Sequence, residues 1–209
     1  MRRPFERIAD AMLTARQIAN IYACKADRAE MWLPHLQAAA RLCDVDEDHN
    51  RLACFLAQVG HESGRLRYTR EIWGPTAQQK RYEYGTPLAK SLGNFRPGDG
   101  KRYMGRGLIQ VTGRVNYHIT TQRMREALKE GVSNANDLPD VPDFEDDPEA
   151  LERPMWAALS AGLYWKLHKL NLYADKHDFV TLTRRINGGI NGLADRQALF
   201  ATAFSSLLD

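Results

Sequence analysis

Apolar residues recur three and four positions apart along most of this chain, a spacing that favours helices over strands. The clearest case is the segment 50–63, which Gly64 is expected to end. At about 100° per residue, Glu62 lies about 20° from Phe55 on the helical wheel, at the edge of the buried face. The stripe of that face comprises Leu52, Phe55, Leu56 and Val59. The sequence therefore predicts a mainly α fold.

Helical periodicity also appears in other segments, including one, 150–168, with a stripe formed by Trp156, Leu159, Leu163 and Leu167. Pro34 predicts a kink or two abutting helices within another of them. Before the last helix, Gly188 and Gly189 suit a helix stop, and Asp195 is expected to cap the last helix. The other predicted helices are 14–22, 27–42, 114–129, 175–186 and 195–208.

Three segments lack this periodicity. Residues 65–104 are rich in Gly, Pro, Tyr and Arg, which predicts a small irregular or hairpin lobe with an exposed loop at 95–100. Residues 105–113 suggest a short extended segment, and 131–149 an acidic, Pro-containing loop. The expected architecture is thus a two-lobed helical domain.

Length and charge set further bounds. With 209 residues, 44% of them hydrophobic, the chain fits one domain with a real core, expected over 13–209 after a flexible extension at 1–12. The net charge of +3 favours an anionic polymer or surface without indicating nucleic acid. We expect a monomer that does not bind nucleic acid.

The cysteines and the first residues indicate a compartment. Cys24, Cys43 and Cys54 are odd in number and suggest no disulfide framework, so folding in a reducing compartment is expected. The six histidines show no metal-ligand spacing, and we expect neither a metal nor a cofactor. The start of the chain has a basic head but no apolar core of a signal peptide, and no stretch approaches a membrane span, so stable membrane insertion is not expected.

Two glutamates nine residues apart are the candidate catalytic pair. Glu62 ends a helix, where the macrodipole and partial burial both favour the protonated form that a general acid needs. Alternatively, Glu62 forms a salt bridge with Arg65 or Arg67. His61 is expected to support Glu62 by packing or hydrogen bonding.

Glu71 is the candidate base. Arg67 and Arg70 nearby would favour its ionised form, and Tyr68 and Trp73 offer rings on which a sugar can lie. Two carboxylates in unlike surroundings are what acid/base hydrolysis of a glycosidic bond requires. The alternative is an exposed glutamate in a charged loop.

The glycine-rich segment 105–117 is the densest group of polar candidates. It lacks the Gly-Lys-Ser/Thr ending of a phosphate-binding loop. Strand alternation would put Leu108, Gln110 and Thr112 on one face, where an amide and a hydroxyl could meet a sugar or a water. A structural turn is the alternative interpretation of its glycines.

Four blocks, in this order, resemble the chitinase-like glycoside hydrolase family 19, and most closely its bacteriophage endolysins. They are FLAQVGHESG at 55–64, RYTRE at 67–71, GRGLIQVTGR at 105–114 and RINGGINGLADR at 185–196. The resemblance implies a lysozyme-like helical fold and hydrolysis with inversion. It implies that Glu62 is the acid and Glu71 the base.

The resemblance also implies which residues bind the sugar. Gln110, Thr112 and Asn116 match the segment that binds sugar and helps to place the water, and Asn187 and Arg196 match cleft-lining positions near the base. Plant-type chitinases of this family have a longer insertion between the two glutamates and bear disulfides. The short interval here is that of endolysins and shifts the expected substrate from chitin to peptidoglycan.

The leading hypothesis is an endolysin that hydrolyses β-1,4 bonds of peptidoglycan glycan strands. It would accumulate in the host bacterial cytoplasm and reach the wall through a separate release system. The alternatives are a chitinase acting on N-acetylglucosamine polymers, a lytic transglycosylase, and a non-catalytic glycan-binding protein.

Overall fold

The computed structural model describes residues 13–130 and 139–208. The predicted extension at 1–12 and the first part of the predicted loop at 131–149 lie outside these residues. The helices in chain order are α1 (Ala15–Tyr22), α2 (Ala26–Leu42), α3 (His49–Glu62), α4 (Ala77–Lys80), α5 (Pro87–Ser91), α6 (Asp99–Arg102), α7 (Arg114–Lys129), the 3₁₀ helix η2 (Pro148–Glu152), α8 (Pro154–Leu167), α9 (Asn171–Ala174), α10 (Phe179–Asn187) and α11 (Leu193–Leu208).

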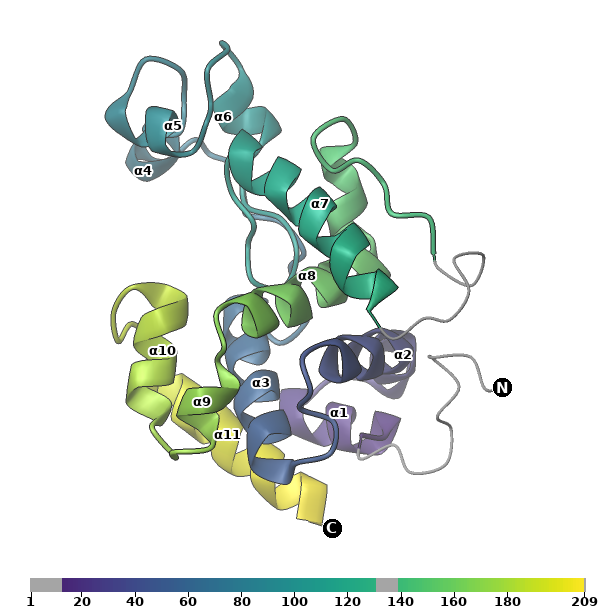
Figure 1. The fold of residues 1–209 in the computed structure, drawn as a ribbon. Coiled ribbons are helices and arrows are strands. Elements are labelled where there is room, and N and C mark those ends of the chain that lie inside the picture. Colours follow the sequence, from purple (N-terminus) through teal and green to yellow (C-terminus); the bar gives the residue numbers. More distant parts are fainter. Residues whose placement is uncertain (1–12, 131–138, 209) are drawn as a thin grey trace.

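The helices form two lobes. In Figure 1, α3 lies inside the larger lobe with α1, α2, α9, α10 and α11 around it, while α4, α5 and α6 lie at the far end of the smaller lobe. The helix α7 runs along the smaller lobe, and α8 crosses between the two. This confirms the expected mainly α, lysozyme-like architecture with two lobes.

Each lobe has its own apolar core, and α8 contributes to both. Ala161 and Trp165 of α8 pack in the larger core with Phe55 of α3, whereas Leu159 and Leu163 pack in the smaller core with Tyr117 of α7. The helix is therefore apolar around most of its circumference, as expected for an element covered on several sides. It sets the position of one lobe against the other.

The approach of α8 to α2 depends on a glycine. We expect Gly162→Ala to lower the free energy of unfolding by about 1–3 kcal/mol, as overpacking does. The added Cβ would lie 2.6 Å from the backbone oxygen of Ala39, so the two helices would have to separate. The matched control is Gly189→Ala, whose Cβ would meet nothing within 4 Å. Equal urea midpoints for the two variants would contradict this explanation of the packing.

The smaller lobe differs from its prediction. Within the irregular segment lie three short helices, α4 to α6, and the pairing among the described residues is limited to isolated bridges of Arg106 with Arg70 and with Val111. Asp99, expected in an exposed loop, is only 2% exposed. It accepts hydrogen bonds of 2.6 and 3.0 Å from Arg114, whose guanidinium also contacts the rings of Phe95 and Tyr103. A long-range charge pair thus buries a residue that looks like part of a turn.

Three smaller predictions also need correction. Of the two outcomes predicted at Pro34, a kink or two abutting helices, the second is wrong, because Pro34 lies inside the single helix α2. The predicted helix 175–186 begins later than expected, because residues 175–178 form the turn between α9, which ends at Ala174, and α10, which begins at Phe179. Leu167 is 49% exposed, since it is the last residue of α8 and extends past the core.

Among the described residues, no helix combines the length and the apolar character needed to cross a bilayer.

Candidate active site

Glu62 is the last residue of α3, and its partner is a buried arginine. Arg196 of α11 is 1% exposed and donates from Nη2 to Glu62 Oε1 at 2.5 Å. Its Nη1 donates to Gln58 Oε1 at 2.5 Å, and Gln58 in turn donates to Thr183 of α10 at 2.9 Å. Three helices therefore hold the Glu62 carboxylate in one orientation. Among the described residues, Glu62 does not form the alternative salt bridge to Arg65 or Arg67.

Arg196 is a correction to the prediction from the resemblance. That prediction put Arg196 and Asn187 in the cleft near the base, but Arg196 contacts Glu62 and is too buried to line an open surface. Its Nε and the Asn187 side-chain amide both donate to the backbone oxygen of Asn191, at 3.2 and 3.0 Å. In this structure the block 185–196 holds Glu62, and Asn187 orders the turn that brings Arg196 there.

His61 forms its hydrogen bond with Asp195 and not with its neighbour Glu62, the expected partner. Its Nδ1 lies 2.6 Å from Asp195 Oδ2, and Arg65 donates to the other oxygen of Asp195 at 2.6 Å. Asp195 lies inside the first turn of α11, which begins at Leu193, so it is not the cap that was predicted. Burial raises the pKa of Asp195, but the hydrogen bonds from His61 and Arg65 outweigh burial and hold it below its ordinary value.

Glu71 is held by neutral donors. The side-chain amide of Gln79 donates to Oε1 at 2.7 Å, and the backbone N–H of Gly105 donates to Oε2 at 2.8 Å. Neither Arg67 nor Arg70, the expected partners, forms an ion pair with Glu71 in the described part of the chain, and Arg70 lies 3.7 Å from Glu152 instead. Each carboxylate oxygen keeps a free lone pair.

Gln110 and Thr112 lie close to Glu71 around Gly105. A Cβ built on Gly105 would lie 2.5 Å from Gln110 Oε1, 3.1 Å from Glu71 Oε2 and 3.2 Å from Thr112 Oγ1. Gln110 Oε1 is buried and accepts no hydrogen bond from the described residues. Glycine at this position leaves room for the three oxygens to converge.

The extended segment predicted for 105–113 is a turn. Gly107 and Gln110 both have positive φ, which breaks the alternation of faces along a strand. Leu108 is fully buried, while Gln110 and Thr112 are partly exposed, so the three do not share one face. The turn, and not a strand, aims the two polar side chains.

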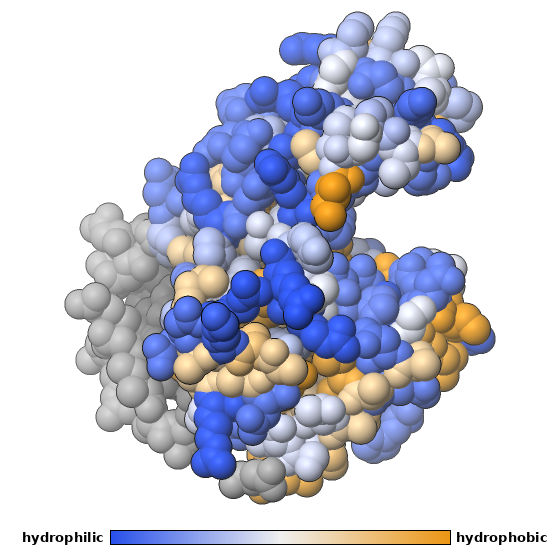
Figure 2. Space-filling view, turned by 180° about the vertical axis from the view of Figure 1, so that it is seen from behind, coloured by the Kyte–Doolittle hydropathy of each residue, from blue (hydrophilic) through white to orange (hydrophobic). Residues whose placement is uncertain are grey.

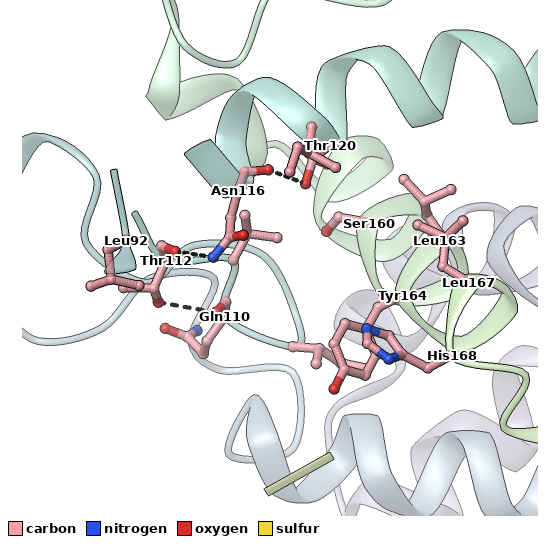
Figure 3. Close-up of a pocket in the computed structure, with 13 residues that line it drawn as sticks. Leu92, Gln110, Thr112, Asn116, Thr120, Ser160, Leu163, Tyr164, Leu167 and His168 are labelled. Atoms are coloured by element: carbon pink, nitrogen blue, oxygen red, sulfur yellow. Dashed lines mark hydrogen bonds between the residues drawn. The ribbon is translucent and has the colours of Figure 1, made fainter. Parts of the chain in front are cut away.

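A cavity of about 400 Å³, the Gln110 cavity, lies between the lobes. Figure 3 shows Gln110, Thr112 and Asn116 on one side and Tyr164 and His168 on the other. Burial raises the pKa of the Tyr164 phenol, and the nearby Glu62 carboxylate raises it further. The cavity is therefore lined by the three residues that the resemblance assigned to sugar binding and by Tyr164, whose pKa is raised in part by the charge of Glu62.

A second, more open groove of about 710 Å³, the Glu71 groove, contains Tyr68, Glu71 and Trp73. Tyr68 is 49% exposed and Trp73 is half-buried, so both are accessible from the groove. Seen from behind in Figure 2, the surface is deeply hollowed between the two lobes. Gln110, Thr112 and Asn116 thus line the Gln110 cavity and Tyr68, Glu71 and Trp73 line the Glu71 groove, whereas Glu62, Asn187 and Arg196 line neither.

Three contributors were not predicted. Gln58 precedes Glu62 by four residues, and this spacing could have predicted that the two side chains lie on the same face of the helix. Gln79 and Tyr164 had no such signal, because their neighbours Glu71 and Glu62 are brought to them by folding. In the described ranges, no group of three or more His, Cys, Asp or Glu could hold a metal ion.

Comparisons with known proteins agree with this architecture. No family model matches the chain. A glycosyl hydrolase family 19 domain-containing protein of Haemophilus influenzae is 33% identical over 172 residues, which are 71% of this chain and 76% of that protein.

Two solved structures share the fold. Chitinase C of Streptomyces griseus is similar with a TM-score of 0.64 and 21% identity, over 95% of this chain and 78% of that one. A bacterial family 19 chitinase is similar with a TM-score of 0.63 and 19% identity, over 94% of this chain and 95% of that one. The fold and the carboxylate site define a glycoside hydrolase. By its relationship to the Haemophilus protein, the chain belongs to glycoside hydrolase family 19.

Proposed function

We propose that this enzyme hydrolyses β-1,4 bonds of peptidoglycan glycan strands, as an endolysin, with inversion at the anomeric carbon. The observation that carries the proposal is the pair of carboxylates in unlike surroundings. Glu62 pairs with the buried Arg196, whereas Glu71 accepts only neutral N–H donors among the described residues. Carboxyl groups in unlike surroundings can take the two different roles of acid and base, and the resemblance to family 19 assigns the acid to Glu62 and the base to Glu71.

In the proposed reaction Glu62 donates its proton to the leaving glycosidic oxygen as the bond from that oxygen to the anomeric carbon breaks. Glu71 takes a proton from a water, whose oxygen bonds to the same carbon from the opposite face. Gln110 and Thr112 lie beside Glu71 around Gly105, which supports a role for them next to that water. The rings of Tyr68 and Trp73 in the Glu71 groove support stacking of a sugar there.

Charge in the Glu71 groove supports peptidoglycan over chitin. The groove is lined by Arg67, Arg70 and Lys101 against the acidic Glu71 and Glu152. Chitin is uncharged, whereas the peptides of peptidoglycan carry carboxylates. A basic lining favours the anionic polymer.

Digestion of two substrates tests the proposal. We expect purified peptidoglycan to yield fragments with ordinary reducing ends by mass spectrometry, and early products to carry the α-anomer by NMR. Rapid cleavage of soluble chitin oligomers with no release from peptidoglycan would favour the chitinase alternative, which the likeness in fold to two chitinases supports. Products ending in 1,6-anhydro sugars would contradict hydrolysis.

A further inference from the structure

A third groove, of about 550 Å³, opens where α1 turns into α2 and is not used by the chemistry above. We call it the Arg28 groove. The turn forms because Ala23 adopts a left-handed conformation after α1, which directs the chain into α2 one residue after Lys25. The residues that line the groove are Tyr22, Ala23, Cys24, Lys25, Asp27, Arg28, Met31 and Arg67.

The groove carries unpaired positive charge. Lys25, Arg28 and Arg67 are all exposed, and within the described ranges none of their side chains takes part in an ion pair or a hydrogen bond. The one carboxylate in the lining, Asp27, accepts a hydrogen bond from the backbone N–H of Arg28 at 2.8 Å. Three cations thus face the groove with one acidic group among them.

The Arg28 groove adjoins the Glu71 groove. Arg67 lines both, so the two meet at its side chain. A glycan strand lying along Tyr68 and Trp73 would therefore pass the end of the Arg28 groove. A substituent on that strand could extend into it while the sugars stay beside Glu71.

We propose that the Arg28 groove is a subsite for the carboxylates of the peptides attached to the glycan strand. The inference rests on the proposed action on peptidoglycan and names the part of the substrate that the enzyme recognises away from the bond it cleaves. Exposed cations give modest affinity each, but several together select an anionic substituent, and salt weakens the attraction. A neutral glycan gains nothing from this groove.

The test is the double variant Lys25→Gln/Arg28→Gln. On peptidoglycan with free peptide carboxylates we expect KM to rise at least about fivefold with kcat unchanged. We expect no change on peptidoglycan whose carboxylates have been amidated, or on soluble chitin oligomers. The matched control is Lys90→Gln/Lys176→Gln, which removes the same charge from exposed positions outside all three grooves. An equal rise in KM for both pairs, or an equal defect on native and amidated substrate, would overturn the subsite.

A binding measurement separates this proposal from the proposed function. Peptidoglycan sacculi should retain the Glu62→Gln variant, and adding Lys25→Gln and Arg28→Gln should reduce that retention at least about fivefold at low salt. Wild-type enzyme that releases no reducing ends, combined with retention lost in the triple variant, would refute hydrolysis of peptidoglycan and keep the subsite. Hydrolysis with unchanged retention would refute the subsite alone. Stronger retention on phosphate-rich wall polymers or on DNA than on sacculi would overturn the assignment to carboxylates.

Discussion

Glu62→Gln should lower kcat on the enzyme's glycan substrate at least ~10²-fold, because an amide cannot donate the proton that the leaving oxygen needs. Glutamine keeps the shape of the side chain and an oxygen that can still accept from Arg196. The fold should therefore survive with the circular dichroism spectrum of the wild type, although the urea midpoint should fall because the buried Arg196 loses its charged partner. Reducing-end release at saturating substrate measures the effect.

A surface glutamate provides the control for this variant. Glu126 pairs with Arg123 on the exposed side of α7, with 61% of its side chain accessible, and Glu126→Gln should keep full activity. Near-normal turnover by Glu62→Gln, with Glu126→Gln also active, would remove Glu62 from the role of general acid.

Arg196→Met should lower the free energy of unfolding by about 3 kcal/mol, the low end for breaking a buried ion pair. The change leaves the fully buried Gln58 oxygen without its donor, and it frees the Glu62 carboxylate from its partner. The effect should not be larger, because the Glu62 side chain is 23% exposed and water can replace part of the lost contact. Urea denaturation gives the difference, and kcat should fall too as Glu62 loses its fixed orientation.

Arg123→Met is the matched control, since it breaks an Arg–Glu pair in which both side chains are more than half exposed. That pair should contribute no more than about 1 kcal/mol. Arg196→Lys adds a second comparison, because an ammonium keeps the charge but cannot reach Gln58 and Glu62 with a planar fork. Similar losses for Arg196→Met and Arg123→Met would show that the buried network does not stabilise α3 against α11.

Local pattern predicted most helices because burial of one face leaves a period in the sequence. The helix 114–129 and the end of the helix that carries Glu62 were predicted almost to the residue. Prediction failed where long-range contacts outweigh local preference. Asp99 looks like a loop residue until Arg114 buries it, and the turn at Gln110 looks like a strand until its positive φ is known.

The candidate acid and base were readable from the chain, since carboxylates at a helix end and beside aromatic residues are features of nearby sequence. Their surroundings were not. Arg196 is 134 residues from Glu62, and Gly105 is 34 residues from Glu71, so no local spacing reveals either contact. Sequence alone determined most of the longer helices and the candidate carboxylate pair, because each depends on residues close together along the chain. The partner of each carboxylate and the meeting of two grooves at Arg67 depend on how distant segments pack, and only the tertiary structure decided them.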